Sequence, residues 1–298
     1  MSDTSPTGPE LLAGRVVVVT GAGRGLGRSH ALELARLGAR VIVNDVGEQA
    51  HAVADEIGER GGEATARIGS VASWEDSLAL VELAVSRYGG LDALVNNAGI
   101  VRDRMLVNMS EEEWDAVVEV DLKGHFCPTR HAAAYWRDRA KAGLPVAARI
   151  VNTSSGAGLL GSVGQSNYAA AKAGVAALTI VAASELARYG ITVNAIAPAA
   201  RTPMTEAVFV EAMRRPESGF DVMSPDNVSP LVAWLVAEES GDVSGRVFEV
   251  AGGMVGVADG WQHGPSVDGG RRWDAAALGP VVRSLLAEAP PAAAVYGS

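Results

Sequence analysis

Residues 16–19 are four consecutive valines, which run directly into a glycine-rich stretch at 20–27 and then into a helical pattern at 28–37. β-Branched side chains favour strands, and an apolar run without alternation is typical of a strand that is buried on both faces. Glycines between such a strand and a helix permit a tight turn and a close approach of the backbone to a ligand. This strand–loop–helix unit predicts the start of a parallel α/β sheet.

The alternation of strand and helix continues along most of the chain. Further runs of strand length occupy residues 41–43, 91–95, 149–152, 192–196 and 246–250. Helical patterns occupy residues 49–60, 74–88, 111–138, 167–189 and 226–238. Strands that alternate with helices imply right-handed βαβ crossovers. We therefore expect an α/β fold with one doubly wound parallel sheet, a Rossmann domain, across residues 13–257.

Three segments lie outside this alternation. Residues 1–12 are polar and rich in proline and glycine, which predicts a flexible arm. Residues 200–225 form a long connection after the sixth strand, and long connections in compact domains are commonly functional, so we expect a lid there. Residues 258–298 form a C-terminal extension with an Ala/Pro-rich end. We expect the aromatic part of this extension, from Trp261 onward, to cover the cleft of its own or of a neighbouring subunit.

Composition narrows the classes of function. The net charge of −10 argues against a nucleic-acid partner or an anionic membrane, and favours a small-molecule substrate. Cys127 is the only cysteine, which excludes an intrachain disulfide and a cysteine metal cluster. The five histidines show no ligand spacing with acidic residues, so we expect no metal, and we interpret His30 and His125 as packed residues. No apolar run reaches 18 residues and no signal pattern is present, which predicts a soluble, cytoplasmic protein.

The glycine-rich stretch has the pattern of a dinucleotide-binding loop. Because it follows a strand and opens a helix, its backbone can approach a pyrophosphate at the helix N-terminus. The residues that we expect to bind the cofactor there are Gly21, Arg24, Gly25, Leu26 and Gly27.

The choice between NAD and NADP depends on the end of the second strand. Asp45 lies there, eighteen residues after Gly27, with Val46 beside it. A carboxylate at this position accepts hydrogen bonds from the ribose hydroxyls and repels a 2′-phosphate. Arg24 favours the opposite choice, because a basic side chain in the loop can reach a phosphate. We give Asp45 the greater weight and predict NAD.

Tyr168 and Lys172 are four residues apart in a predicted helix and therefore share one of its faces. An ammonium beside a phenol lowers the phenol pKa from its usual value of about 10. Ser155 lies thirteen residues before Tyr168, in a loop from which its hydroxyl can hold the same substrate oxygen. The pattern Tyr-x-x-x-Lys is common on helix surfaces, so the other motifs are needed to make it a catalytic hypothesis of proton transfer at a carbonyl or carbinol oxygen.

Taken together, the motifs resemble those of the short-chain dehydrogenase/reductase family over about residues 13–257. They are Thr20-Gly-x-x-x-Gly-x-Gly27, Asn96-Asn97-Ala98-Gly99, Ser155 with Tyr168-x-x-x-Lys172, and Asn194-x-x-x-Pro198. The resemblance implies that Tyr168 is the catalytic acid/base, that Ser155 orients the substrate oxygen, and that Lys172 binds the nicotinamide ribose and lowers the Tyr168 pKa. It also implies further cofactor contacts from Ser70, Val71, Asn97, Ala98, Gly99, Pro198, Thr202 and Met204.

Two positions depart from the family's pattern. Asp121 stands where the family usually has an asparagine that holds a water in a proton relay to the lysine. We keep Asp121 among the catalytic residues, with the alternative that it only caps a helix or pairs with Lys123. The usual Pro-Gly after the sixth strand is Pro198-Ala199 here, and Thr202 is still expected to hold the nicotinamide carboxamide.

Within the family, residues 43–47, 97–104 and 230–235 resemble the (3R)-hydroxyacyl-CoA dehydrogenase region of peroxisomal multifunctional enzyme type 2. The resemblance implies NAD-dependent hydride transfer at a secondary alcohol or ketone of a 3-hydroxyacyl-CoA or a hydroxysteroid-like substrate. Two alternatives remain open at this point: a 3-oxoacyl reductase, and a non-catalytic NAD-binding protein that senses redox state. We also expect a homotetramer or homodimer formed through the helices at 111–138 and 167–189.

Overall fold

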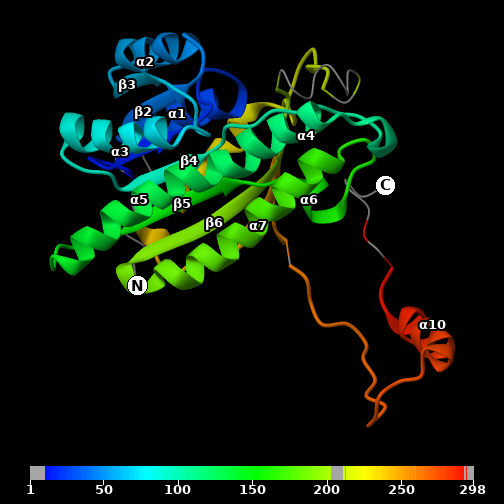
Figure 1. The fold of residues 1–298 in the computed structure, drawn as a ribbon. Helices are drawn as coiled ribbons and strands as arrows, with labels where there is room; N and C mark the ends of the chain where they lie inside the picture. Colours follow the sequence, from blue (N-terminus) through cyan, green and yellow to red (C-terminus); the bar gives the residue numbers. More distant parts are fainter. Residues whose placement is uncertain (1–10, 203–210, 212, 259, 292, 294–298) are drawn as a thin grey trace, which may run out of the picture.

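The computed structural model describes residues 11–202, 211, 213–258, 260–291 and 293. Its centre is an eight-stranded sheet of order β3-β2-β1-β4-β5-β6-β7-β8 (Figure 1). The strands are β1 (Val16–Val19), β2 (Arg40–Asp45), β3 (Glu63–Ile68), β4 (Ala93–Asn96), β5 (Ala148–Thr153), β6 (Ile191–Ala199), β7 (Val247–Ala251) and β8 (Met254–Ala258). Strands β1 to β7 pair in parallel, and β8 pairs antiparallel with β7.

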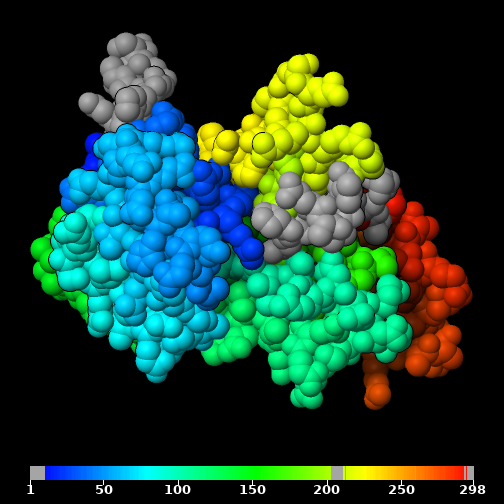
Figure 2. Space-filling view, turned by 90° about the horizontal axis from the view of Figure 1, so that it is seen from above, coloured from blue at the N-terminus to red at the C-terminus, as the bar shows by residue number. Residues whose placement is uncertain are grey.

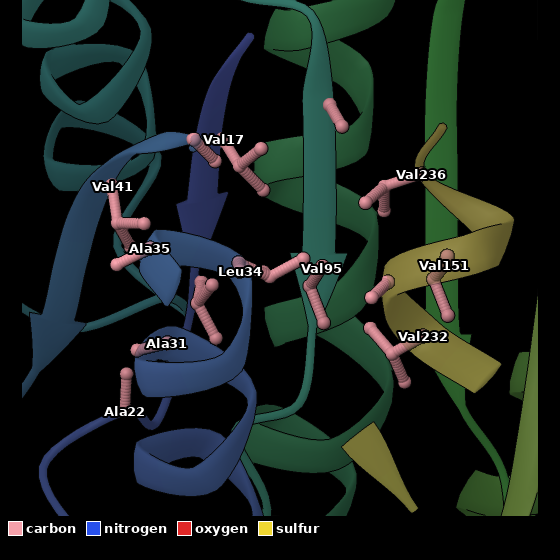
Figure 3. Close-up of a cluster of buried hydrophobic side chains, with 14 of the residues drawn as sticks. Val17, Ala22, Ala31, Leu34, Ala35, Val41, Val95, Val151, Val232 and Val236 are labelled. Atoms are coloured by element: carbon pink, nitrogen blue, oxygen red, sulfur yellow. The ribbon is translucent and has the colours of Figure 1, made fainter. Parts of the chain in front are cut away.

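Helices cover both faces of the sheet, which confirms the predicted doubly wound α/β fold. One face carries α1 (Gly25–Arg36), α2 (Gln49–Glu59) and α9 (Ser229–Leu235), and the other carries α3 (Trp74–Tyr88), α5 (Gly124–Lys141) and α7 (Ser166–Leu186). The first face has a core of small aliphatic side chains, with Leu34, Val95 and Val232 meeting between α1, β4 and α9 (Figure 3). Such side chains let the helices pack closely on the sheet and fix the strand ends that carry the site.

Four elements differ from the sequence prediction. Strand β3 was missed because polar and apolar residues alternate along it, as suits the edge of a sheet. Strand β8 adds an antiparallel edge to a sheet that was expected to be wholly parallel, after a turn at Gly252 with φ 55°. The predicted helix at 111–138 is three pieces: α4 (Glu111–Val117), a π-helical segment (Val118–Lys123) and α5. The extension contains an unpredicted helix, α10 (Leu278–Glu288).

The predicted lid at 200–225 is only partly within the described residues, since 203–210 and 212, with Met204 among them, lie outside. Its two described ends are joined, because the Arg201 backbone N–H donates to the Met223 carbonyl at 2.7 Å. The Arg201 side chain pairs with Asp221 and donates to the carbonyl of Met213. Whether this segment acts as a lid stays a prediction.

Helix α7 and the turn after it, Ser166–Tyr189, are long and apolar enough to cross a membrane by length and composition alone. One such helix is weak evidence, because core helices of α/β proteins pass the same test. Here α7 packs on β6 and on α6 (Gly156–Leu160), and it buries the charged side chain of Lys172. We therefore interpret it as a helix that covers the sheet.

A buried polar network joins α1 to the start of α9. The hydroxyl of Ser229 lies 2.7 Å from that of Ser29 and 2.9 Å from Nδ1 of His30, and Ser29 also donates to Asp226 at 2.8 Å. His30 is fully buried, which lowers its pKa from 6.5 to about 3. His30 is thus a packed residue, as the sequence predicted, and the folded protein keeps it neutral.

The buried His30 should make the protein less stable in mild acid. Below pH 6.5 the unfolded chain takes up a proton at this residue and the folded protein does not, so stability falls as the pH falls toward 3. Between pH 7 and pH 5 His30 lowers the free energy of unfolding by about 2 kcal/mol. Urea denaturation of His30→Gln should show a pH dependence that is weaker by about that amount. An unchanged pH dependence would contradict the neutral state of His30.

Candidate active site

A cleft of about 430 Å³ lies at the carboxyl ends of the central strands. This is the edge at which parallel α/β sheets bind ligands, where the strand order reverses between β1 and β4. The predicted site residues that line it are Gly21, Arg24, Gly25, Leu26, Asp45, Val46, Ser70, Val71, Asn97, Ala98, Gly99, Ser155, Tyr168, Lys172, Pro198 and Thr202. Gly27 and Asp121 lie directly behind this lining, and Met204 is outside the described residues.

Sequence reasoning missed other residues of the cleft. They are Asn44, Gly69, Ile100, Val101, Arg102, Val120, Thr153, Ser154 and Ala200. Most of them are direct chain neighbours of predicted residues, so extending each motif by one or two positions would have found them. Val120 is different, because it is brought to the cleft by the π-helical segment, which carries no recognisable sequence signal.

The glycine loop is folded so tightly that side chains are excluded at two positions. A Cβ on Gly27 would lie 2.2 Å from the Gly21 carbonyl oxygen, and one on Gly21 would lie 2.7 Å from the Cα of Ala98. Gly21 also has φ 60°, which disfavours residues with a side chain. The Asn97 amide donates to the carbonyls of Thr20 and Gly21 at 3.0 and 3.1 Å, so the turn after β4 holds the loop after β1 in place.

The N-terminus of α1 fits an anionic ligand. Its N-cap residue, Arg24, makes no side-chain capping bond, and the first turn holds no acidic residue. The first N–H groups of a helix have no partner within it, and the helix dipole favours negative charge at this end. Together with the space left by the glycines, this arrangement fits the pyrophosphate of a dinucleotide cofactor.

Asp45 connects the end of β2 to the glycine loop. Its Oδ2 accepts a hydrogen bond from the Gly23 backbone N–H at 2.9 Å, and its Oδ1 accepts one from the Gly47 N–H at 3.1 Å. Each carboxylate oxygen can accept a second bond, so the group remains able to bind ribose hydroxyls. Arg24 is exposed and lines the same cleft. Asp45 and Arg24, the two residues on which the choice between NAD and NADP depends, therefore both lie where they can contact the cofactor.

Ser155, Tyr168 and Lys172 come together at the opposite end of the cleft, as the sequence predicted. Ser155 caps the N-terminus of α6, accepting a bond from the Ala157 N–H at 3.2 Å, and it lines the same part of the cleft as Tyr168. The ammonium of Lys172 lies 5.5 Å from the centre of the Tyr168 ring and donates to the Thr153 carbonyl at 3.0 Å. A substrate oxygen placed between Ser155 and Tyr168 would therefore meet two hydroxyls.

Asp121 is part of this group through a buried ion pair. Its Oδ2 lies 3.2 Å from the Lys172 ammonium, and its Oδ1 accepts a bond from the Ile100 N–H at 2.8 Å. The alternative that Asp121 pairs with Lys123 is wrong, because Lys123 is exposed and pairs with Glu119. The extra residue in a π-helical turn widens it, and such turns are frequent at functional sites.

The pKa of Tyr168 differs from the sequence expectation, which was that Lys172 would lower it. Burial raises the pKa of Tyr168 above its usual value, Lys172 and the Ser155 hydrogen bond act to lower it, and Asp121 and Asp103 raise it. Lys172 therefore acts in the expected direction, but burial and the two carboxylates outweigh it. Burial also raises the pKa of Asp121, against the opposing effect of Lys172.

His125 lies behind the same centre and is buried. Its Nε2 accepts a hydrogen bond from the Thr153 N–H at 3.4 Å, and burial, together with the charge of Lys172, lowers its pKa well below 6.5. A neutral imidazole in this position supports the end of β5 and does not reach the cleft, which agrees with its interpretation as a packed residue.

Comparison with known proteins agrees with this geometry. The sequence model of the short chain dehydrogenase family matches residues 15–212. The chain is 49% identical to hydroxyacyl-CoA dehydrogenase ChsB1 of Mycobacterium tuberculosis, over 97% of this chain and 95% of that protein. It is 42% identical to mouse peroxisomal multifunctional enzyme type 2, over 83% of this chain and 33% of that longer protein.

A solved structure has the same fold. The crystal structure of a short chain dehydrogenase from Mycobacterium avium superposes with a TM-score of 0.89 at 56% identity, over 97% of this chain and 100% of that one. The family match spans more than half of the chain and includes the glycine loop and the Ser155, Tyr168 and Lys172 centre. The chain belongs to the short-chain dehydrogenase/reductase family and is an oxidoreductase that acts on hydroxyl or oxo groups.

Proposed function

We propose that this protein is an NAD-dependent dehydrogenase of a 3-hydroxyacyl-CoA or a hydroxysteroid-like substrate. The observation that carries the proposal is the convergence of Ser155, Tyr168 and Lys172 at one end of a cleft whose other end holds the glycine loop and Asp45. The name of its relative ChsB1, hydroxyacyl-CoA dehydrogenase, supports the substrate class.

The residues of the chain have distinct roles in the oxidation. A nicotinamide cofactor held by the glycine loop and Asp45 would supply the hydride acceptor for the carbinol carbon when it is bound. The Tyr168 oxygen takes the hydroxyl proton as the C–H bond breaks, and Ser155 donates a hydrogen bond to the oxygen that becomes the ketone. Lys172, held by Thr153 and Asp121, provides positive charge beside the phenol and lies where it can bind the nicotinamide ribose. In the reverse direction Tyr168 returns the proton.

The walls of the cleft support an apolar substrate. Ile100, Val101 and Val120 line it beside the catalytic residues. The chain continues from the lining residues Val101 and Arg102 to a contact with the segment before Tyr168, where the Arg104 N–H donates to the Gly164 carbonyl at 2.7 Å. Val107 and Val163 are about nine-tenths exposed on these two segments. Apolar side chains that remain in water around a cleft are typical of a binding surface.

The two alternatives are less well supported. A 3-oxoacyl reductase working with NADP would place a 2′-phosphate against the Asp45 carboxylate, and like charges in close contact are unfavourable. A purely NAD-binding regulator has no need of a serine hydroxyl, a phenol and a lysine gathered in one part of the cleft. Both alternatives are tested by the experiments that follow.

Removal of the Tyr168 hydroxyl should abolish most of the turnover. Tyr168→Phe keeps the ring and its packing but has no proton to exchange, so kcat should fall by about 10²–10⁴-fold. NAD binding, measured by titration calorimetry, should be unchanged within about twofold. The assay follows reduced nicotinamide with a 3-hydroxyacyl-CoA, a hydroxysteroid and a cyclic alcohol. Equal turnover by the wild type and Tyr168→Phe would contradict the role of Tyr168.

Asp121→Asn tests whether the buried carboxylate limits the effect of Lys172 on Tyr168. The asparagine keeps an acceptor for the Ile100 N–H but has no charge, so Lys172 should act on the phenol with less opposition. The acidic limb of the pH profile of kcat/KM for alcohol oxidation should move to lower pH.

Glu119→Gln is the matched control for this experiment, since Glu119 lies in the same π-helical segment but is exposed and pairs with Lys123. Its pH profile should match that of the wild type. If the profile of Asp121→Asn also matches the wild type, Asp121 does not act on Tyr168 through its charge.

Asp45→Asn tests the choice of cofactor. The wild type should show a higher kcat/KM with NAD than with NADP, and the substitution should reduce this ratio about tenfold or more, because it removes a charge that repels the 2′-phosphate. Glu48→Gln, an exposed carboxylate three residues along the chain, is the control and should not change the ratio. A wild type that prefers NADP would overturn the assignment of NAD.

A further inference from the structure

One wall of the cleft consists of the segment after β4. Residues 100–102 line the cleft, whereas none of the described part of the C-terminal extension does, although this extension was expected to cover it. Figure 2 shows the segment after β4 and the following α4 in teal, next to the dark-blue glycine loop. The wall is held against the start of α7, because the Arg104 N–H donates to the Gly164 carbonyl at 2.7 Å. Since Tyr168 lies in the first turn of α7, the position of the wall relative to α7 sets the space beside its phenol.

Asn167, directly before Tyr168, joins these elements. Its Nδ2 donates to the carbonyl of Arg102 at 3.0 Å and to that of Glu113, in α4, at 3.1 Å. Its Oδ1 accepts a hydrogen bond from the Tyr168 N–H at 2.7 Å. Asn167 is 0% exposed, so water cannot replace these partners in the folded protein. One buried side chain thus connects the cleft wall, α4 and the first turn of α7.

The start of α7 relies on this side chain for capping. The first N–H groups of a helix have no carbonyl partner within it, and an N-cap side chain normally accepts from one of them. The N-cap residue of α7 is Gln165, which makes no such bond and instead donates to the Asp103 carboxylate at 3.1 Å. Asn167 accepts from the Tyr168 N–H in its place. The backbone that carries the phenol is therefore held by Asn167.

Asparagine suits this position because its amide has two N–H donors and an acceptor. Aspartate has a similar shape but no N–H, and it would place a charge against two carbonyl oxygens. Leucine would leave two carbonyls and one N–H without partners in the protein interior, which is costly. Asparagine is otherwise disfavoured within helices, because its side chain competes for backbone hydrogen bonds. Its presence in α7 is explained by the two carbonyls that come from outside this helix.

We propose that Asn167 is a positioning residue for the reaction. Through its three hydrogen bonds it holds Tyr168 at a fixed distance from the wall of residues 100–102. Asn167 does not line the cleft itself, so it acts through Tyr168 and the wall and not by touching the substrate. The carbinol must lie within hydrogen-bond distance of the Tyr168 oxygen, and a misplacement of about 1 Å can slow such a step by about 10²-fold. The inference rests on the proposed function, in which Tyr168 takes the carbinol proton.

The test compares Asn167→Ala with Asn194→Ala in the full chain. Asn194 is a matched control, because it is 1% exposed and also bonds to backbone groups, but it does not line the cleft. Its amide donates to the Val243 carbonyl at 2.8 Å, and its oxygen accepts from the Arg246 N–H at 3.1 Å. Both changes should lower the melting temperature, since each leaves buried backbone groups without partners. Only Asn167→Ala should slow the reaction in the folded protein.

A single turnover in a stopped-flow instrument separates misplacement of Tyr168 from loss of folded protein. With NAD and folded enzyme in saturating excess over a 3-hydroxyacyl-CoA, the rate constant for formation of reduced nicotinamide does not depend on the folded fraction. It should fall about 10–100-fold in Asn167→Ala and stay within about twofold of the wild type in Asn194→Ala. Asn167→Ser keeps a hydroxyl that can donate to one carbonyl, so it should give an intermediate rate constant. It serves for the same comparison if Asn167→Ala does not fold.

Hydrogen exchange provides a second measurement, which needs neither cofactor nor substrate. The amides of Tyr168 and Arg104 should exchange faster in Asn167→Ala than in the wild type and in Asn194→Ala, because the first turn of α7 and the wall are then less firmly held. Unchanged exchange at both amides would overturn the positioning role. A rate constant in Asn167→Ala equal to that of the wild type or of Asn194→Ala would overturn it as well.

Tyr168→Phe distinguishes a failure of this inference from a failure of the proposed function. If the wild type turns over and Tyr168→Phe does not, an unaffected Asn167→Ala overturns the positioning role alone. A wild type without turnover, or a fully active Tyr168→Phe, would overturn both.

Discussion

The contact between the loop after β1 and the turn after β4 holds the site together. The Thr20 hydroxyl accepts bonds from the N–H groups of Asn97 and Ala98 at 3.0 and 3.2 Å, and the Asn97 amide donates back to the loop. These bonds join the two halves of the sheet where the strand order reverses. They fix the glycine loop against the turn after β4, and they leave no room for side chains at Gly21 and Gly27.

The end of the cleft near Tyr168 contains a buried ion pair. Lys172 and Asp121 are 2% and 0% exposed, and two unpaired charges at this depth would be very costly. Burying the two charges as an ion pair costs less free energy than burying each alone. The pair also places one positive and one negative group close to the phenol of Tyr168. Gly99 makes this possible, because a Cβ there would lie 2.9 Å from Asp121 and 3.3 Å from Lys172. The pair is part of the proposed reaction centre through the contact of Lys172 with the Tyr168 ring.

The features that local patterns encode could be predicted from the sequence. The apolar runs predicted the strands β1, β2, β4, β5, β6 and β7. The glycine spacing predicted the loop that precedes α1. Ser155, Tyr168 and Lys172 were found because the pattern Tyr-x-x-x-Lys occurs together with the glycine loop and the other family motifs. Nearly all of the described residues that were predicted to contact the cofactor line one cleft.

The features that tertiary contacts decide could not be predicted. Asp121 has Lys123 two residues away in the sequence but pairs with Lys172, because a π-helical turn directs it inward. The direction of the Tyr168 pKa depends on burial, which a motif does not report. Strand β3 lacks an apolar run, since a sheet edge needs less of one.

The most direct test of the account is to follow the hydride itself. The wild type would be incubated with NAD and a 3-hydroxyacyl-CoA that carries deuterium on the carbinol carbon, and the nicotinamide product analysed by mass spectrometry. We expect one deuterium in each reduced nicotinamide and an equal amount of the 3-oxoacyl-CoA. NAD that stays oxidised while the protein binds it, or reduction that occurs only with NADP, would contradict the account.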